Sequence, residues 1–443
     1  MQRRNFLGLT GAAAISPVMG RLGIGGAGEM LQVPGKDRNR IKNIAGYTPG
    51  ELLSQYREYL FDDFLPFMEK YVIDHEQGGF FWNIDRDGTI ITTNKRTWYD
   101  GRGIWVYSFL YNNLRQDPKY IETAKKTIDF VFRIKPSDTV LWPASYSREG
   151  NPRNDFPQDI YGDLFIAEGL AEFSKAVQDT GYRIKAKEII MKCIDLYDSN
   201  DFSYIVDYGP EAAPLTAPRV SGHWMVFLRT CYCMLCHGPD IDLEKIVNRC
   251  YDALMNYHYN PEYNLINEVM KHDLTRPEGP FSQFVYCGHV IETMWMVMFE
   301  AVRRKDTQMF STAAERFKRH VEVAWDDVYG GVFRSLVNVN DNIWKVDKVL
   351  WEQSEVLIGI LFLLEYTGDP WAYQWFDKMY KYVTNTFPLK KYGFPLWNID
   401  GDRKVTFVRE GVRIENYHHP RHLMLNILSL ERIIREDYRV KGI

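Results

Sequence analysis

The chain has few cysteines, no long apolar run after its first residues and no excess of charge of one sign. Six cysteines in 443 residues are too few and too clustered for a disulfide framework. No uncharged stretch of about 20 apolar residues, the length that crosses a bilayer, follows the N-terminal segment. Lys plus Arg number 54 against 58 Asp plus Glu, without blocks of like charge. These features exclude a disulfide-stapled module and argue against stable membrane insertion and nucleic-acid binding.

The sequence also lacks the motifs of common cofactor sites. No Gly-rich loop of the kind that cradles phosphate groups is present, so we expect no nucleotide site. Cys233-Met234-Leu235-Cys236-His237 has the spacing of a c-type haem attachment site, but it occurs once and lies inside a predicted helix. Cys231 and Cys233 would point to different faces of that helix, which disfavours a metal site. We therefore expect no cofactor and no metal.

The N-terminus has the pattern of an export signal. Arg3-Arg4 is followed by the apolar pair Phe6-Leu7 and by a small, weakly apolar stretch. Because this arrangement is typical of a twin-arginine signal, we expect residues 1–25 to form a signal segment, 26–45 a flexible linker and 46–443 a single domain. The expected location is the periplasm; a cytoplasmic protein with a flexible leader is the alternative.

Six polar clusters recur along the chain, and each opens an apolar helical stretch. Neighbouring clusters are 60 to 66 residues apart when one residue of each serves as its marker. The markers are Arg102, Asp163, His223, His289, Glu355 and His418. In the same rhythm, Trp82-Asn83-Ile84-Asp85 returns as Trp397-Asn398-Ile399-Asp400, and Gly78-Gly79-Phe80 is answered by Gly330-Gly331-Val332. Self-similarity at a fixed period predicts a repeated structural unit.

Apolar residues at helical spacing predict twelve amphipathic segments, which pair into six hairpins. Their approximate limits are 50–72, 98–115, 118–134, 159–178, 182–198, 220–237, 241–258, 288–304, 307–324, 349–366, 370–386 and 419–436. Segments that follow a polar cluster are apolar nearly all round, and the segments between them carry a charged face. The sequence therefore predicts an all-α (α/α)6 toroid with short β-hairpins in its loops. An open superhelix is the alternative, although its common units are shorter.

Two histidines stand at the starts of predicted inner helices. His289 and Glu292 are three residues apart, so we expect them to share a helix face and the carboxylate to fix the tautomer of the imidazole. His418 places a second imidazole at the same end of the toroid. A core histidine with a satisfied hydrogen bond is the alternative for His289 and Glu292 taken alone. Two imidazoles beside an arginine, Arg102, predict a site of proton transfer.

Arg102 is expected to bind an anion. It lies between Trp98 and Trp105 in an apolar helix, where a buried guanidinium needs an anionic partner. An enediolate oxygen, which becomes negative only after a proton has left carbon, is one such partner. A structural salt bridge to Asp100 or Asp163 is the alternative.

Three further residues complete the predicted pocket. Asp163 and Glu355 are expected to bind hydroxyl groups or to pair with basic groups rather than to act chemically. Trp351 is expected to form a stacking wall.

In this order and spacing, the motifs resemble those of the N-acylglucosamine 2-epimerase family, which also contains cellobiose 2-epimerases and isomerases of mannose or sulfoquinovose. The resemblance runs from about Tyr47 to Leu430. Its motifs are Lys95-x-x-Trp98-x-x-Gly101-Arg102-x-x-Trp105, Gly288-His289-x-Ile291-Glu292-x-x-Trp295, Lys348-x-x-Trp351-x-x-Ser354-Glu355 and His418-x-Pro420-Arg421. The first, third and fourth look more like the N-acylglucosamine branch than the cellobiose branch.

The resemblance implies an (α/α)6 barrel with no metal and no redox cofactor. His289 and His418 match the family's two acid-base histidines, Arg102 the arginine that steadies the enediolate, and Glu292 the partner of His289. His223 lies where some members carry a further pocket histidine. The other residues expected to bind substrate or to support these side chains are Trp98, Asp163, Trp351, Glu355 and Arg421.

The chain departs from the family pattern at two places. Arg413-Ile414 stands where the family has an aromatic residue and a lysine, and Leu350-Trp351 replaces a tryptophan doublet. Both departures bear on the substrate more than on the chemistry.

The implied reaction is the interconversion of C2 epimers of a sugar, with an N-acylglucosamine/N-acylmannosamine pair as the expected substrate class. One histidine would take the C2 proton of the open-chain sugar and the other would return it; delivery to C1 instead would give a ketose. A glycoside hydrolase that uses two of the carboxylates, or a sugar-binding relative without activity, is the alternative. The sequence leaves the oligomeric state open, a homodimer included.

Overall fold

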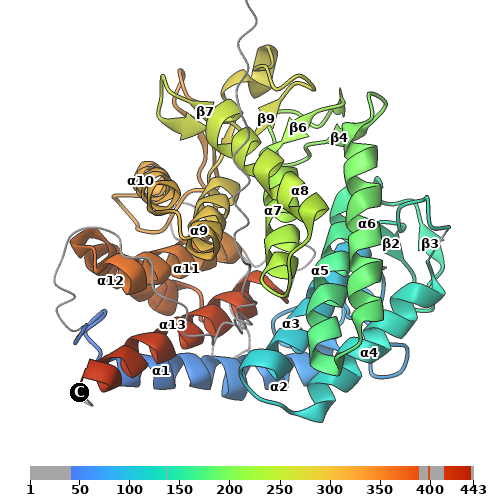
Figure 1. Cartoon of the computed structure of the whole chain (residues 1–443), viewed down its shortest axis with the longest axis horizontal. Coiled ribbons are helices and arrows are strands. Elements are labelled where there is room, and N and C mark those ends of the chain that lie inside the picture. The colour runs from blue at the N-terminus through green and yellow to red at the C-terminus, as the bar shows by residue number, and fades with distance from the viewer. Residues whose placement is uncertain (1–40, 136, 389–397, 400–413, 441–443) are drawn as a thin grey trace, which may run out of the picture.

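The helices of the described chain form an inner and an outer ring (Figure 1). The computed structural model describes residues 41–135, 137–388, 398–399 and 414–440. The signal segment predicted at 1–25 and most of the linker predicted at 26–45 lie outside these residues. At the end of that linker, Ile44 is fully buried and pairs with Tyr47 in an isolated β-bridge.

Six helices make up the inner ring, and each contacts the next. They are α3 (Thr97–Asn113), α5 (Ile160–Val177), α7 (Ser221–Leu235), α9 (Cys287–Arg304), α11 (Leu350–Thr367) and α13 (His418–Val440). α13 also contacts α3, which closes the ring. Nearly all side chains of α7 and most of those of α11 are buried, as predicted for helices that are apolar all round.

Amphipathic helices surround this ring on the outside. They are α4 (Pro118–Arg133), α6 (Thr180–Asp198), α8 (Ile241–Asp252) continued by the π-helical η3 (Ala253–Tyr257), α10 (Thr307–Ala324), α12 (Pro370–Thr386) and an N-terminal segment of α1 (Pro49–Glu58), η1 (Tyr59–Phe64), α2 (Leu65–Phe67) and η2 (Met68–Val72). An aspartate caps each of α4, α6, α8, α10 and α12 by accepting a backbone N–H bond from the first turn. The twelve predicted segments and the (α/α)6 fold are confirmed.

Four inner helices begin differently from the outer ones. α3, α7, α9 and α11 follow directly on a two-residue strand, and no side chain of the described residues caps them. Each strand pairs antiparallel with a strand beyond the next outer helix. The pairs are β1 (Lys95–Arg96) with β2 (Ser145–Tyr146), β6 (Arg219–Val220) with β9 (Val269–Met270), β10 (Val285–Tyr286) with β11 (Ser335–Asn338) and β13 (Lys348–Val349) with β14 (Asn398–Ile399). These pairs gather the loops around the starts of the inner helices.

Short β-hairpins decorate the loops, as predicted. They pair β2 with β3 (Pro152–Arg153), β4 (Ser203–Ile205) with β5 (Pro214–Thr216), β7 (Tyr259–Asn260) with β8 (Leu265–Ile266) and β11 with β12 (Ile343–Lys345). A short 3₁₀ helix, η4 (Gly279–Gln283), precedes β10.

The sequence repeat corresponds to a repeated turn in the structure. The four glycines of Gly78-Gly79 and Gly330-Gly331 have φ between +77° and +84°, a region that glycine adopts without steric cost. After each turn, a backbone N–H reaches the first turns of an inner helix: Phe80 donates to Asp100 and Val332 to Gln353. Of the second Trp-Asn-Ile-Asp copy, only residues 398–399 belong to the described chain.

A buried ion pair lies under each of these turns. Lys95 donates to Asp74 at 2.9 Å, and Lys348 pairs with Asp326 in the same way. Both lysines are fully buried and stand in the strand before an inner helix. The pairs therefore join the outer turn to the start of the helix.

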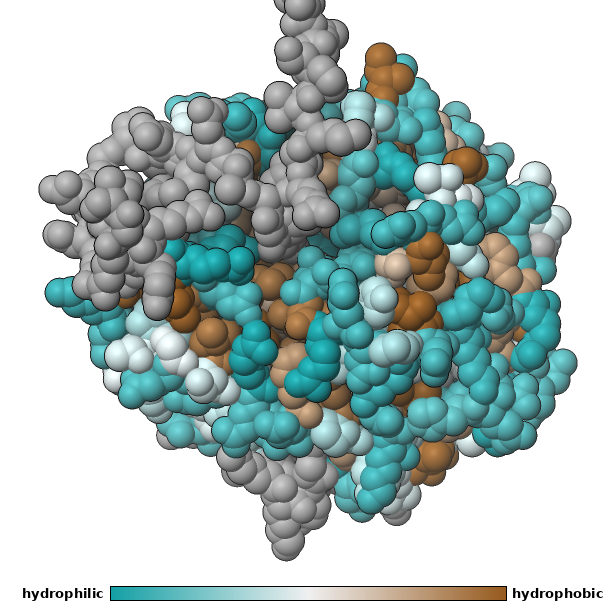
Figure 2. Space-filling view, turned by 60° about the horizontal axis from the view of Figure 1, so that its bottom comes forward, coloured by the Kyte–Doolittle hydropathy of each residue, from teal (hydrophilic) through white to brown (hydrophobic). Residues whose placement is uncertain are grey.

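No helix of the described residues has both the length and the apolar character needed to cross a bilayer. The face shown in Figure 2 is mainly hydrophilic, with apolar side chains exposed in small groups.

Candidate active site

The first turns of the inner helices contact one another around the face where these helices begin. The guanidinium of Arg102 on α3 lies 4.1 Å from the ring centre of Phe165 on α5. One turn earlier on α5, the ring of Tyr161 packs against the imidazole of His223 on α7, with 4.4 Å between ring centres. Three successive helices are thus linked by side chains near their starts.

The remaining contacts complete the circle. Gly222 on α7 faces the imidazole of His289 on α9, where a Cβ atom would lie 2.9 Å from the ring. The ring centres of His289 and Trp351 on α11 are 5.9 Å apart, and those of Trp351 and His418 on α13 are 4.9 Å apart. Tyr417, which precedes α13, lies 4.8 Å from the guanidinium on α3. Both predicted acid-base histidines therefore pack against one indole.

A carboxylate in the loop before β9 holds His289. Its Nδ1 lies 2.8 Å from Oε1 of Glu268, the buried residue that precedes β9. The hydroxyl of Tyr208 donates to the same oxygen at 2.8 Å, and the hydroxyl of Ser221 donates to Oε2 at 2.5 Å. Both hydroxyls donate to this carboxylate, which acts as a hydrogen-bond acceptor. It therefore accepts a hydrogen bond from Nδ1–H of the imidazole, and Nε2 is left as the basic nitrogen.

The predicted pairing of His289 with Glu292 is wrong. Glu292 contacts Arg421 instead, through a short ion pair. Three residues turn a helix by about 300°, so side chains at this spacing diverge by about 60°. Here the divergence points Glu292 toward α13 and leaves His289 to the loop carboxylate.

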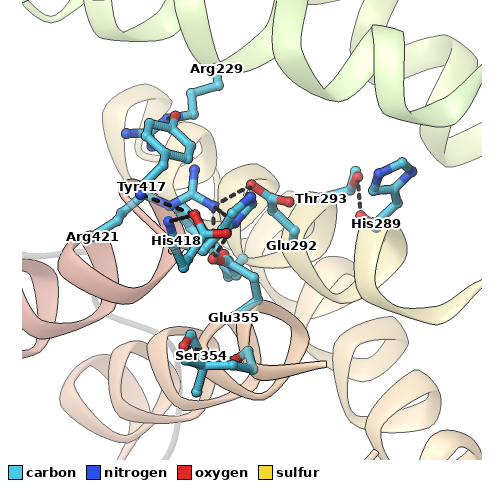
Figure 3. A network of polar contacts seen from close by, with 12 residues as sticks. Arg229, His289, Glu292, Thr293, Ser354, Glu355, Tyr417, His418 and Arg421 are labelled. Carbon is cyan, nitrogen blue, oxygen red and sulfur yellow. Dashed lines mark hydrogen bonds and ion pairs between the residues drawn. The ribbon is translucent and has the colours of Figure 1, made fainter. Parts of the chain in front are cut away.

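His418 belongs to a buried network of charged groups (Figure 3). Its Nδ1 lies 3.0 Å from Oε1 of Glu355 and 3.0 Å from Nη2 of Arg421. The same Nη2 contacts Glu292 and lies 2.8 Å from Oε1 of Glu355. The second oxygen of Glu355 accepts a hydrogen bond of 2.8 Å from the indole of Trp295. Glu355 and Arg421 thus both contact the imidazole of His418.

Part of this network has the donor set of a metal site. Ligand atoms of Glu292, Glu355 and His418 lie within 4.8 Å of one another. The guanidinium of Arg421 contacts all three of these residues and carries the positive charge that the two carboxylates require. The residues present therefore fit an arginine-centred network better than a bound cation.

Aromatic rings surround the guanidinium of Arg102. The distances from its Cζ to the ring centres are 4.6 Å for Trp98, 4.1 Å for Phe165 and 4.8 Å for Tyr417. Stacking uses the faces of the guanidinium, whereas its N–H groups lie in its plane, so stacking is compatible with hydrogen bonds to an anion. Trp98 therefore supports Arg102.

A second buried network fixes the tyrosine of this group. The hydroxyl of Tyr417 donates to Glu168 at 2.7 Å, and Arg229 donates to the other oxygen of Glu168 at 2.6 Å. These hydrogen bonds hold Tyr417, one of the three rings around Arg102, in place.

The structure does not bring Asp163 to the site. Its carboxylate accepts bonds from Lys192 and from the backbone of Trp142, and burial raises its pKa to about 6. Asp100 likewise serves a structural role and accepts a bond from the hydroxyl of Tyr146. Neither carboxylate forms the salt bridge to the α3 arginine that was the alternative.

His223 lies behind the site rather than on its surface. The imidazole is fully buried among aromatic rings, including Tyr161 and Tyr204 at 4.4 and 4.5 Å. Burial lowers its pKa to about 3, so the ring is neutral at ordinary pH. His223 reaches the catalytic face only through its neighbours.

The two departures from the family pattern have different surroundings. Arg413 lies outside the described residues. The carbonyl of Ile414 accepts a 2.7 Å hydrogen bond from the hydroxyl of Tyr99, which ties this segment to α3. Leu350 packs with Phe387 and Ile399 in a small apolar cluster away from the histidines.

Glu268 and Tyr208 are functional residues that sequence reasoning missed. Both stand in loops, outside the helix starts that carry the repeated clusters. The signal that could have identified Glu268 is its place in the chain. It stands immediately before β9, which pairs with β6, the strand that precedes α7.

Known proteins resemble the chain over most of its length. A sequence profile described as N-acylglucosamine 2-epimerase (GlcNAc 2-epimerase) matches residues 78–419. The N-acylglucosamine 2-epimerase of Bos taurus is 23% identical over 372 residues, which cover 80% of this chain and 85% of the relative. The cellobiose 2-epimerase of Dictyoglomus turgidum is 25% identical over 333 residues, which cover 70% and 80%.

A solved structure shares the fold. The cellobiose 2-epimerase of Spirochaeta thermophila superimposes with a TM-score of 0.73 at 16% identity, over 87% of this chain and 98% of that one. The architecture derived above is therefore also that of a solved enzyme.

Proposed function

The chain belongs to the N-acylglucosamine 2-epimerase family and is an isomerase, and from this premise we propose that it interconverts an N-acylglucosamine with its C2 epimer, an N-acylmannosamine. The observation that supports this reaction best is the placement of two imidazoles against the same indole, at 5.9 and 4.9 Å, in a site that also contains Arg102. Epimerisation at C2 needs a proton acceptor and a proton donor on opposite faces of one carbon.

The first step is removal of the C2 proton from the open-chain sugar. His289 suits this step because Glu268 holds its Nδ1 proton and would stabilise the imidazolium that forms. The electron pair of the C–H bond is delocalised onto the C1 carbonyl and gives an enolate, or an enediolate when C2 carries a hydroxyl, whose negative oxygen the guanidinium of Arg102 would bind. That interaction strengthens as the charge develops, so it lowers the barrier rather than only binding substrate.

The second step decides the product. Protonation of C2 by His418 from the opposite face yields the epimer, whereas protonation at C1 would yield a ketose only from a sugar that carries a hydroxyl at C2. Both outcomes use the same side chains. The substrate class is supported by the motifs Gly101-Arg102, Ser354-Glu355 and His418-x-Pro420-Arg421, which look more like the N-acylglucosamine branch.

Proton NMR in D2O tests this function directly. We expect the C2 proton signals of N-acetylglucosamine and N-acetylmannosamine to disappear with the purified protein while the other epimer accumulates. Mannose, glucose, cellobiose and mannobiose complete the panel. A ketose product would replace the epimerase with an aldose-ketose isomerase, and new reducing ends without C2 exchange would identify a hydrolase. The variants His289→Ala and His418→Ala should each lose at least about 10²-fold in kcat.

Export is a separate part of the proposal. Arg3-Arg4 and the weakly apolar stretch behind it support twin-arginine transport to the periplasm. In fractionated cells the full chain should be periplasmic, and changing both arginines to lysine should retain it in the cytoplasm. Cytoplasmic retention of the unchanged chain would overturn export without touching the catalytic proposal.

A further inference from the structure

One nitrogen of Arg421 lies near more hydrogen-bond acceptors than it has hydrogen atoms. Nη2 carries two hydrogen atoms, yet Glu292, Glu355 and Nδ1 of His418 all lie within 3.0 Å of it. The two carboxylates form charge-assisted bonds, the stronger kind, and take both hydrogens. The contact with His418 is then left without a hydrogen from the guanidinium.

A proton must therefore lie between His418 and Glu355. Nδ1 and Oε1 are 3.0 Å apart, and two bare lone pairs would repel each other at that distance in a buried site. The indole of Trp295 can only donate, so Oε2 of Glu355 is an acceptor and a carboxyl proton would sit on Oε1, the oxygen that faces the imidazole. Two arrangements satisfy this geometry: the proton on Glu355 with His418 protonated at Nε2, or the proton on Nδ1.

Charge balance favours the first arrangement in the resting protein over an ionised Glu355 beside a neutral His418 protonated at Nδ1 alone. Two carboxylates and one guanidinium carry a net charge of −1, and Glu355 and Arg421 are both fully buried. A proton on Glu355 makes the group neutral, which removes the cost of burying an unbalanced charge. Burial also raises the pKa of Glu355 above its ordinary value, although Arg421 lowers it in part. The nearby Arg229 is balanced by Glu168.

We propose that Glu355 is the proton partner of His418, a positioning and relay role that rests on the proposed epimerase function. As Nε2 gives its proton to C2, the carboxyl proton of Glu355 moves to Nδ1, and the enolate electron pair forms the new C–H bond while the C1 carbonyl returns. His418 stays neutral throughout, and Glu355 ends as a carboxylate. His289 works differently: with Glu268 already satisfied by two hydroxyls, it alternates between neutral imidazole and imidazolium. The reverse turnover, or exchange with water, resets both groups.

Nitrogen NMR of the resting protein reads the two tautomers without substrate. In ¹⁵N-histidine-labelled protein, with signals assigned through His289→Gln and His418→Gln, we expect His418 to be protonated at Nε2 and His289 at Nδ1. Protonation of His418 at Nδ1, alone or together with Nε2, would overturn the resting arrangement. This readout stands even where the catalytic function fails.

The variant Glu355→Gln removes the transferable proton: its amide can donate to Nδ1 and keep the tautomer, although the amide nitrogen gives up the bond from Nη2 of Arg421. In D2O, we expect epimer formation to fall at least about 10²-fold in both directions. Solvent exchange at C2 should persist in one epimer only, the one whose C2 proton faces His289. The matched variant Glu268→Gln should abolish exchange in that same epimer. Normal epimerisation by Glu355→Gln, or equal loss of exchange in both epimers, would overturn the relay. Absence of exchange in the unchanged protein would instead overturn the proposed function.

Discussion

The hydroxyl of Tyr208 lies 2.8 Å from Oε1 of Glu268, the same oxygen that contacts His289. A loop tyrosine thus helps to orient the carboxylate that contacts the histidine. The variant Tyr208→Phe keeps the ring, whose centre is 5.4 Å from that of His289, and removes one hydrogen bond. Because such a bond contributes about 0.5–1.5 kcal/mol, we expect kcat to fall up to about tenfold, measured by epimer formation. A loss as large as that of Glu268→Gln would show that the hydroxyl does more than orient the carboxylate.

The replacement Arg102→Lys should cost about 10²-fold or more in kcat while the protein stays folded. An ammonium is a point charge that cannot stack against three aromatic rings and present a planar N–H edge. Initial rates and circular dichroism check the two halves of this prediction. Arg115→Lys is the matched control. The Cζ atom of Arg115 lies 4.0 Å from the ring centre of Phe61, and this pair stands outside the site. Activity near the unchanged level in Arg102→Lys would contradict a role for the guanidinium.

The two repeated ion pairs should differ in their contribution to stability. Lys348→Met should lower the free energy of unfolding by about 3–5 kcal/mol, because Asp326 has no second cation among the described residues. Lys95→Met should cost less, since Arg148 still donates bonds of 2.8 and 2.9 Å to Asp74. Urea unfolding followed by circular dichroism measures both.

The exposed pair of Lys125 with Asp129 on α4 provides a control for these variants. Lys125→Met should change stability by no more than about 0.5 kcal/mol, as expected of a solvated ion pair. An equal loss from all three lysine variants would mean that burial is not what distinguishes them.

The buried carboxyl of Glu352 should make stability depend on pH. Burial raises the pKa of Glu352 well above its ordinary value of 4.5, so the folded protein retains a proton that the unfolded chain releases above that pH. The free energy of unfolding therefore falls as the pH rises above the ordinary pKa. It falls by about 1.4 kcal/mol per pH unit until the pH reaches the raised pKa of the folded protein. Compared with the unchanged protein, Glu352→Gln should gain relative stability as the pH rises above about 5. Thermal unfolding at several pH values measures the difference, and a constant difference would contradict the prediction.

The helices could be predicted from the sequence because their signals are local. Apolar residues that recur every three or four positions lie close together in the chain, and all twelve predicted segments lie within a few residues of the observed helices. The histidines and Arg102 could be assigned to one face because the repeat places each at the start of an inner helix. The π-helical turns at Tyr59–Phe64 and Met68–Val72 carry no comparable local signal and were not predicted.

The partners of the catalytic residues could not be predicted in the same way. Glu268 meets His289 only because β9 pairs with β6, some 50 residues earlier in the chain. The pairing of Glu292 with Arg421 spans 129 residues and depends on how α9 packs near α13. Helical spacing indicates which side chains project from the same side of a helix, but not which neighbouring element they contact.

The missing caps on α3, α7, α9 and α11 have an electrostatic consequence. Each helix carries a macrodipole equivalent to about half a positive charge at its N-terminus. An aspartate cap offsets that charge in the outer helices, whereas no N-cap side chain offsets it in these four inner helices. On α3 the first-turn Asp100 reduces it. The backbone itself therefore contributes a positive potential where an enolate would form. Since no side-chain substitution removes this field, part of the anion stabilisation should survive even when Arg102 is gone.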